Sequence, residues 1–304
     1  MSTDIARGIS LMLVACGLLT ANDAFVKSLV STLPLGQVIA IRGLFALATV
    51  LLVAPRVGGY GRLMATSHRA VLLCSGLLVI NIIIFPLGLP HMPLANAIIL
   101  AYTSPIWVVA LAPIFLSERV RWQQWGAVLI GFVGAFLVVK PGSSGFNWAV
   151  VFPLTVAFLV GVRDMVTRRI AGSESALSIV AYANVLTIAA GLLMLPFGWD
   201  SMTLYQVGQL FLAGVFFSVS QLMMVEAFRM VEATILSTFK YSAILFAALF
   251  GYLFWGEVLD MAALVGALFI VISGLVIVRY RHKPLATGTE VLPRVARGQG
   301  DSKS

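Results

Sequence analysis

Two side chains of opposite charge, Asp23 and Lys27, stand four positions apart in a run rich in Leu, Val, Ala and Phe. On an α-helix, positions i and i+4 lie on one face, so the two side chains are expected to point the same way. Inside a membrane each charge costs ~2.5–3.5 kcal/mol, whereas an exposed i,i+4 pair returns only ~0.3–0.5 kcal/mol. Local stability does not account for this pair, so a functional role is indicated.

A second set of polar residues interrupts two other apolar runs. Tyr102, Thr103 and Ser104 come directly before Pro105, which removes a backbone hydrogen bond and distorts the preceding helical turn. In a membrane such a distortion is tolerated only where the freed carbonyls meet protein groups or water. We expect these bands to bind substrate, and the candidate substrate-binding residues are Tyr102, Ser104, Trp107, Lys240 and Tyr241. The alternative is that Ser and Thr only join helices, but Lys240 lies too deep in its span to snorkel freely.

The elements that must position these residues are membrane spans. Of the 304 residues, 60% are hydrophobic and only 11% are charged, against about 25% charged in soluble domains. Apolar windows of ~20 residues recur along the chain, which is typical of a polytopic helical membrane protein. The predicted fold is therefore all-α, with ten transmembrane helices near residues 8–30, 35–53, 70–89, 94–115, 122–139, 148–169, 176–196, 206–228, 233–255 and 262–280.

The distribution of positive charge predicts the orientation. If the N-terminus is cytoplasmic, fifteen of the twenty Lys and Arg residues fall in cytoplasmic segments and only Lys140 falls in an outer loop. Such a bias places both termini in the cytoplasm and requires an even number of spans. The same rule explains the net charge of +8 without a nucleic-acid partner. We expect a multi-pass protein of the bacterial inner membrane.

Polar positions recur at a nearly constant offset. Asp23 and Lys27 reappear 141 residues later as Asp164 and Arg168, and Tyr102 reappears as Tyr241 at an offset of 139. Matching positions across five spans indicate a duplicated unit. Because five is odd, the second copy must cross the membrane in the opposite sense, as in many transporters. The predicted units are a first repeat (1–140), a second, inverted repeat (141–281) around a shared central cavity, and a disordered basic cytoplasmic tail (282–304).

The intramembrane charges sort by depth into two groups. Asp23, Lys27 and Arg42 lie toward the outer side, and Arg42 is the expected partner of Asp23. Toward the inner side we expect Arg163, Asp164, Glu226 and Lys240, bordered by Arg168. Two clusters on repeat-related helices suggest gates that open alternately, and the candidate gating or coupling residues are Asp23, Lys27, Arg42, Arg163, Asp164, Arg168 and Glu226. The alternative is a pair of static salt bridges.

The sequence lacks several catalytic patterns. It contains no HExxH, no GxSxG, no P-loop and no GxGxxG at the start of a helix. All three histidines fall in loops or in the tail, and neither cysteine has a metal-ligating partner nearby. We therefore expect no catalytic residues, no metal site, no cofactor and no enzymatic activity.

Three pairs of stretches resemble one known family, the EamA-type transporters of the drug/metabolite transporter superfamily. The stretches are Asn22 to Lys27 with Gln37 to Gly43, Thr103 to Trp107 with Phe115 to Arg119, and Gly251 to Glu257 with Gly266 to Gly274. The resemblance covers roughly residues 5–281 and implies ten helices, a central cavity and secondary transport of small metabolites. It also implies that Glu118 and Glu257 are structural residues at helix ends. The chain departs from the stricter pattern at Ile244, which occupies the place of Pro105.

These observations favour an ATP-independent transporter for small polar metabolites such as amino acids, amines or S-adenosylmethionine. Lys240 or Arg42 would bind a carboxylate, Asp23 or Glu226 would bind an amine, and the aromatic residues would form apolar walls. The expected partners are the solute, the lipid bilayer, and a proton or a counter-substrate for coupling. The alternatives are a lipid-processing membrane enzyme and a structural or receptor-like protein.

Overall fold

The computed structural model describes residues 3–57, 59–65, 67–115, 122–140, 147–170, 175–231, 236 and 239–280. Within these ranges it does not describe the side chains of residues 3, 4, 57, 70, 112, 114, 115, 167–170, 176, 225, 228 and 229. The predicted tail (282–304), Glu118 and the side chain of Arg168 therefore lie outside the described part of the chain.

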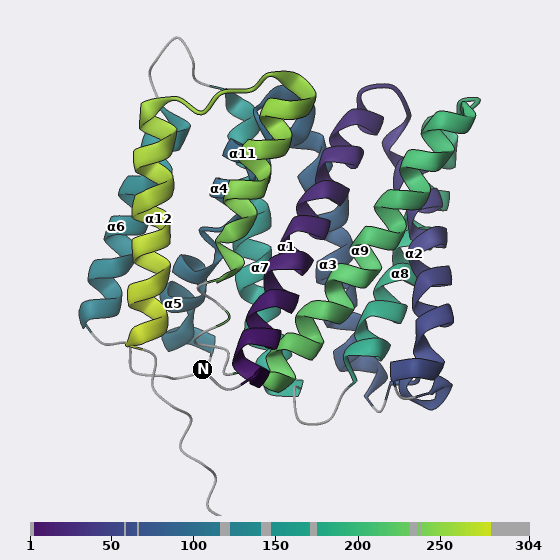
Figure 1. The fold of residues 1–304 in the computed structure, drawn as a ribbon, viewed down its shortest axis with the longest axis horizontal. Helices are drawn as coiled ribbons and strands as arrows, with labels where there is room; N and C mark the ends of the chain where they lie inside the picture. The colour runs from purple at the N-terminus through teal and green to yellow at the C-terminus, as the bar shows by residue number, and fades with distance from the viewer. Residues whose placement is uncertain are drawn as a thin grey trace, which may run out of the picture.

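Every regular element in the described ranges is a helix, and the long helices stand side by side (Figure 1). They are α1 (Thr3–Val30), α2 (Leu35–Val57), α3 (His68–Gly88), α4 (Leu94–Ala101), α5 (Ser104–Phe115), α6 (Trp122–Val139), α7 (Val151–Ile170), α8 (Ala176–Leu193), α9 (Leu204–Met230), α11 (Ser242–Trp255) and α12 (Met261–Arg279). Short 3₁₀ turns join some of them: η1 (Tyr60–Leu63), η2 (Leu89–His91), η3 (Trp148–Val150) and η4 (Leu195–Phe197).

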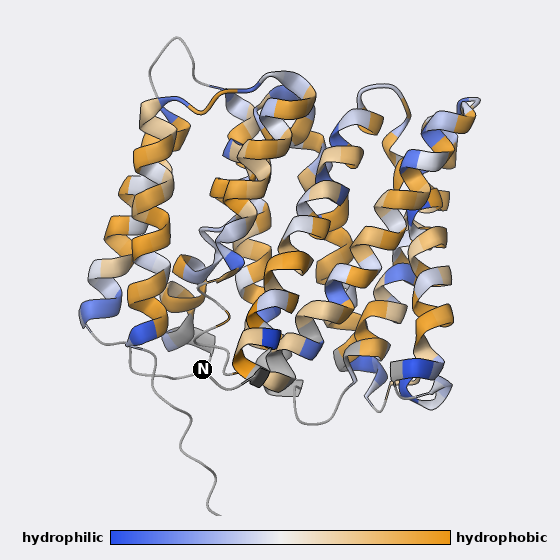
Figure 2. Ribbon diagram, viewed as in Figure 1, coloured by the Kyte–Doolittle hydropathy of each residue, from blue (hydrophilic) through white to orange (hydrophobic). Residues whose placement is uncertain are grey.

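The ten predicted spans are confirmed. Among the described residues, eight stretches are long and apolar enough to cross a membrane, and two shorter apolar helices, Leu177–Leu193 and Ser242–Trp255, lie within the seventh and ninth predicted spans. Apolar residues fill the middle of the bundle and polar residues gather toward its two ends (Figure 2). Large apolar side chains such as Leu52, Leu129 and Leu245 are more than 65% exposed, the pattern expected of a surface that faces lipid.

Helices of the first half of the chain pack mainly on helices of the second half. Helix α1 packs on α9 and α11, and its counterpart α7 packs on α3 and on α4 and α5. Likewise α2 packs on α9 while α8 packs on α3. The pairs α2–α8 and α6–α12 join corresponding spans to each other. This reciprocal packing is what two inverted five-span repeats produce.

Glycine permits the closest of these crossings. A Cβ atom on Gly266 would lie 2.6 Å from the Gly134 carbonyl oxygen, and one on Gly134 would lie 2.7 Å from the Gly266 carbonyl oxygen. Helices α6 and α12 therefore touch backbone to backbone, as small residues allow in membranes. Gly126, lower on α6, has open space around its Cα.

Polar side chains tie the halves together at the upper end in Figure 1, opposite the N-terminus. Lys140, at the end of α6, forms an ion pair with Asp260, whose carboxylate also accepts the Ala263 N–H at 2.8 Å to cap α12. Gln37 exchanges two hydrogen bonds with the backbone of Asp200, at 2.8 and 3.0 Å. We call this end the upper face and the end that holds the N-terminus the lower face.

Replacing Gly266 with alanine should destabilise the bundle, because the added methyl group overlaps the α6 backbone and overpacking costs about 1–3 kcal/mol. The matched control is Gly126→Ala, which should leave stability unchanged or raise it by up to about 1 kcal/mol through helix propensity. Thermal unfolding in detergent measures both. Equal melting temperatures for the two variants would contradict a tight α6–α12 crossing.

The Lys140–Asp260 pair should make stability depend on acid pH. The Lys140 ammonium and the Ala263 N–H hold the pKa of Asp260 below its usual value, near 3.9 in an unfolded chain. The stabilisation is therefore complete above about pH 4 and is lost as the pH falls through the lowered pKa. The melting-temperature advantage of the wild type over Asp260→Asn should be constant near neutral pH and shrink at about pH 3. An advantage that grows with acidification would refute this assignment.

Candidate functional site

Two helix breaks lie next to each other inside the bundle. The first break separates α4 from α5 at Tyr102 and Thr103, and the second precedes α11 at Tyr241. The ring centroids of Tyr102 and Tyr241 are 5.7 Å apart. The two tyrosines that share a repeat position, at an offset of 139 residues, therefore lie next to each other inside the bundle.

The first break follows from local sequence. Pro105 has no N–H for the Ala101 carbonyl, and the Ile106 N–H instead reaches back three residues to the Thr103 carbonyl at 2.9 Å. The Thr103 hydroxyl donates to the Leu100 carbonyl at 2.7 Å, which supplies a polar partner at the end of α4. The chain can change direction here without exposing that carbonyl to lipid.

The second break forms without a proline. Ile244 occupies the place of Pro105, yet its N–H also reaches back three residues, to the Tyr241 carbonyl at 3.1 Å. Cys16 on α1 approaches from the side, with its Sγ 3.8 Å from the Lys240 carbonyl oxygen. Both halves therefore bend at the same repeat position, and a neighbouring helix supports the bend where proline is absent.

The two tyrosines have different surroundings. A Cβ on Gly274 of α12 would overlap the Tyr241 hydroxyl, so Tyr241 fits against α12 only because residue 274 has no side chain. Tyr102 belongs to the α4–α5 break, is partly buried, and packs against the Tyr241 ring.

On α1, Asp23 connects to Arg42 through a third residue. The Arg42 Nη1 donates to Asn22 Oδ1 at 3.0 Å, and Asn22 Nδ2 donates to Asp23 Oδ1 at 2.9 Å. Arg42 is 6% exposed and also lies over the Phe217 ring, 5.0 Å from its centroid. The expected direct ion pair between Asp23 and Arg42 is therefore wrong in detail, because Asn22 fills the space between them.

Lys27 does not pair with Asp23 either. It forms an ion pair with Glu257, and its Nζ donates to the Met92 carbonyl at 3.0 Å and lies 4.7 Å from the Trp255 ring centroid. The second Glu257 oxygen accepts the Leu94 N–H at 2.8 Å. We call Lys27, Glu257 and these two backbone groups the upper lock, since they join α1, the α3–α4 connection and the α11–α12 turn.

The turn after α11 places Glu257. Gly256 adopts a left-handed conformation (φ 65°), and the Glu257 N–H returns to the Gly251 carbonyl at 3.1 Å. This arrangement is the Schellman ending of a helix, which glycine favours. A Cβ on Gly251 would lie 2.8 Å from Glu257 Oε2, so this second glycine leaves room for the carboxylate. The sequence predicted Glu257 to be a structural residue at a helix end. The spacing Gly251–Gly256–Glu257 and the repeat were the signals that could have identified it as the acid of the upper lock.

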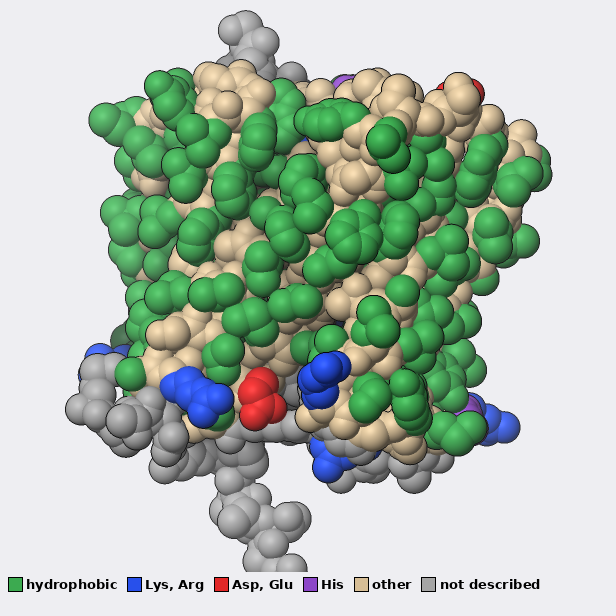
Figure 3. Space-filling view, turned by 45° about the vertical axis from the view of Figure 1, so that its right-hand side comes forward, with side chains coloured by type: hydrophobic (Ala, Val, Ile, Leu, Met, Phe, Trp, Pro, Cys, Tyr) green, Lys and Arg blue, Asp and Glu red, His purple; other side chains and the backbone are tan. Residues whose placement is uncertain are grey.

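The predicted lower group is less buried. Arg163 and Asp164 on α7 lie 3.6 Å apart, with their side chains 28% and 43% exposed. Glu226 on α9 and Lys240 are half-buried, and each interacts with other groups. A few charged side chains follow the lower edge of the molecule in Figure 3, while hydrophobic side chains cover most of the face above them.

Trp107 packs away from the tyrosine pair. Its ring makes edge contacts with Phe132 of α6 and Phe158 of α7, at centroid distances of 5.9 and 5.3 Å, and both phenylalanines are more than a third exposed. Ser104 lies at the start of α5, where its carbonyl faces Gly161 of α7. The structure therefore brings Tyr102 and Tyr241 together and places Trp107 on the α6–α7 side.

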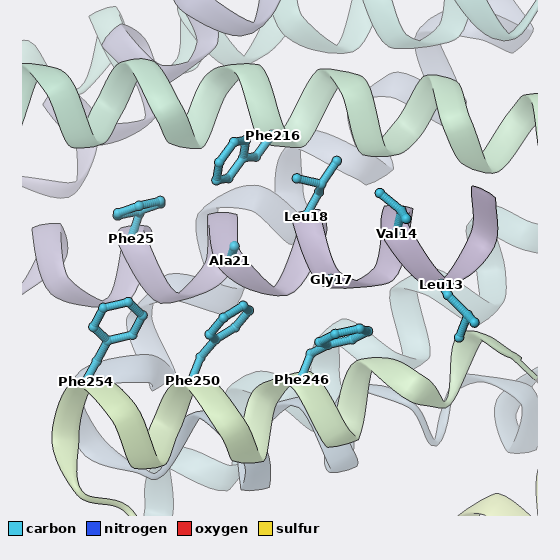
Figure 4. A pocket seen from close by; sticks show the side chains of 10 residues that line it. All are labelled: Leu13, Val14, Gly17, Leu18, Ala21, Phe25, Phe216, Phe246, Phe250 and Phe254. Atoms are coloured by element: carbon cyan, nitrogen blue, oxygen red, sulfur yellow. The ribbon is translucent and has the colours of Figure 1, made fainter. Parts of the chain in front are cut away.

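A cavity of about 530 Å³ lies on the other side of α1, between α1, α9 and α11 (Figure 4). Its lining is apolar and includes Phe25, Phe216, Phe246, Phe250 and Phe254. Sequence reasoning did not identify it. The signal was the repetition of phenylalanine every four residues along the ninth span, which places three rings on one face of α11.

The part of the chain that the structure describes holds no group of three His, Cys, Asp or Glu side chains suited to a metal ion. At the breaks the structure instead brings two tyrosine rings together between helix ends. Such a site can bind a small polar molecule through hydrogen bonds and ring contacts.

Comparisons with known proteins identify the family of the chain. Residues 6–140 and 147–279 each match the model of the EamA-like transporter family. An S-adenosylmethionine uptake transporter of Rickettsia bellii is 27% identical over 281 residues, which cover 92% of this chain and 96% of that protein. The pseudopaline exporter CntI of Pseudomonas aeruginosa is 29% identical over 284 residues, covering 90% and 97%.

Two further matches are more distant or shorter. A riboflavin transporter of Rhizobium johnstonii is 32% identical over 193 residues, covering 63% of this chain and 64% of that protein. A crystal structure of a protein with 16% sequence identity superposes with a TM-score of 0.62, covering 91% of this chain and 96% of the other. At that identity the match concerns the fold alone.

Breaking the upper lock from one side should destabilise the protein strongly. Lys27→Met or Glu257→Gln leaves a buried charge without its partner, which costs about 3 kcal/mol or more. The double variant should lose less than the sum of the two, because neither charge then remains alone. The control is Lys140→Met, which removes the exposed ion pair and should cost about 1 kcal/mol or less. Additive losses in thermal unfolding would show that Lys27 and Glu257 are not coupled.

Proposed function

Because the chain belongs to the EamA-like transporter family, we propose that it is a secondary transporter of small polar metabolites that works by alternating access without ATP. The family and its named relatives are transporters rather than enzymes. The proposed substrates are amino acids, amines or related zwitterions such as S-adenosylmethionine. Relatives that carry S-adenosylmethionine, pseudopaline and riboflavin support a small organic solute.

The observation that carries this proposal is the meeting of two repeat-related helix breaks at Tyr102 and Tyr241. Discontinuous helices at the interface of inverted repeats are where transporters place their substrate, because the freed backbone groups need polar partners. A static scaffold would have no use for two such breaks, each of which weakens a membrane helix.

In the proposed site, one charged side chain would bind the substrate on each side of the two tyrosine rings. Asp23 would bind the amine from the upper side, since its second oxygen is not engaged by Asn22. Lys240 would bind the carboxylate from the lower side, next to Tyr241 in the sequence. Tyr102 and Tyr241 would form the walls, and Ser104 and Trp107 remain predicted contributors from α5.

The gates follow from the difference between the two faces. The upper lock is closed, with the Lys27 side chain only 7% exposed, whereas the Asp164 side chain is 43% exposed. We assign Lys27, Arg42 and Asp23 to the upper gate. The lower gate comprises Arg163, Asp164, Arg168 and Glu226, which would close when the upper lock opens.

The proposed setting is the bacterial inner membrane, with both termini in the cytoplasm. The excess of Lys and Arg in the loops of the lower face supports this orientation. The moving units would be the two repeats, residues 1–140 and 141–281. A proton or a counter-substrate would supply the coupling.

Uptake into proteoliposomes tests this function. A labelled panel of amino acids, polyamines, S-adenosylmethionine and riboflavin, with and without a pH gradient, should yield flux for at least one zwitterion. Tyr241→Ala should lower its initial rate roughly fivefold, because one aromatic wall is worth about 1 kcal/mol. The matched control is Tyr252→Ala on the same helix, whose ring is 62% exposed and should not matter. Absence of flux for every solute, or equal losses in the two variants, would reject the proposal.

A further inference from the structure

A second cavity, of about 250 Å³, lies near the upper face between α4, α6 and the turn η3. Its walls combine polar and apolar side chains, among them His91, Asn96, Asn147, Leu100, Val138 and Val150. It shares no lining residue with the phenylalanine cavity or with the tyrosine pair. The role of this cavity is not explained by the substrate site at the helix breaks.

One polar atom in this cavity wall lacks a partner. Asn96 Oδ1 is buried and accepts no hydrogen bond. Leaving such an acceptor unpaired costs about 1–3 kcal/mol. The neighbouring amide of Asn147 is already engaged, because its Nδ2 donates to the His91 carbonyl and its Oδ1 accepts the Ala149 N–H at 2.9 Å. An occupant of the cavity therefore has an acceptor to satisfy, so it should carry a hydrogen-bond donor such as an N–H group.

The wall of the cavity is also the anchor of the upper lock. Met92 and Pro93 line the cavity, while the Met92 carbonyl accepts from Lys27 and the next residue, Leu94, donates its N–H to Glu257. At the other end the cavity reaches Leu100, two residues before Tyr102. The cavity thus lies alongside α4, the helix that runs from the upper lock to the first helix break.

We propose that this cavity is a second solute site, which takes a small ammonium or primary amide through Asn96. Its volume is below the roughly 300–1,000 Å³ of pockets for drug-sized ligands, so it suits a group no larger than a small amino acid. If a solute binds here on its way past the upper lock, that role rests on the proposed transport function. The binding itself does not depend on transport.

The test uses a cysteine reporter in the full-length protein in detergent. Val139→Cys places a thiol in the cavity wall, and the native Cys16 and Cys74 are buried. Glycinamide, which carries both an ammonium and an amide, is the probe. At millimolar concentration it should slow the reaction of this thiol with methyl methanethiosulfonate at least fivefold. Wild-type protein gives the background rate.

Variants at Asn96 decide whether the protection is specific. Adding Asn96→Leu should abolish it, and Asn96→Asp should move it to lower glycinamide concentrations, because a carboxylate binds an ammonium more strongly than an amide does. The control is Asn184→Leu on α8, another buried amide with an unpartnered Nδ2, which should keep the protection. Absence of slowing would show that glycinamide does not enter the cavity, and the same slowing in Asn96→Leu would show that Asn96 does not bind it; either result overturns the proposal. Because no gradient or flux is involved, failed transport would leave this result standing.

Discussion

The hydrocarbon core of a membrane offers no water to an unpaired backbone group, and this constraint decides the interior of the protein. Two spans are broken in their middle, so the carbonyls at the breaks must find partners within the bundle. The Thr103 hydroxyl serves the first break, and the Cys16 thiol approaches the second. Helices α1 and α12 must therefore pack closely around the breaks, and Gly274 permits this where Tyr241 meets α12.

Much of the fold could be predicted from the sequence, because long apolar runs and polar positions in register carry strong signals. The ten spans and the break at Pro105 follow from such local patterns. The break at Tyr241 was not predicted, since Ile244 stands at the repeat position of Pro105 and has no special effect on a helix. The wrong details concern side-chain partners: i,i+4 spacing suggested Asp23 for Lys27, but Glu257 lies within reach across 230 positions of chain. That choice depends on how the α11–α12 turn approaches α1, which no local pattern contains.

In the described part of the chain, two ion pairs join the halves at the upper face, and in both of them the first half supplies the cation. Lys27 and Lys140 come from the first half, and their partners Glu257 and Asp260 come from the second. Each half thus offers charge that the other half neutralises, and the halves are held together at this face by groups that water can separate. The α6–α12 crossing combines this kind of contact with a second one. The Lys140–Asp260 pair joins the end of α6 to the start of α12, while along the two helices Gly134 and Gly266 bring backbone against backbone and the Ser273 hydroxyl donates to the Ala127 carbonyl at 2.6 Å. Water can separate the ion pair at the exposed end, whereas the backbone contact is buried between the helices.

The phenylalanine-lined cavity beside α1 has a consequence for the surroundings of the protein. Its rings come from α1, α9 and α11, and all the residues that line it belong to these three helices (Figure 4). In the proposed membrane setting its apolar walls suit acyl chains, which would pack against α1, the helix that carries Asp23 and Lys27. The mobility of α1 would then be tied to the order of the surrounding lipid, and a change of growth temperature or of fatty-acid saturation would reach the proposed upper gate without any change in the protein.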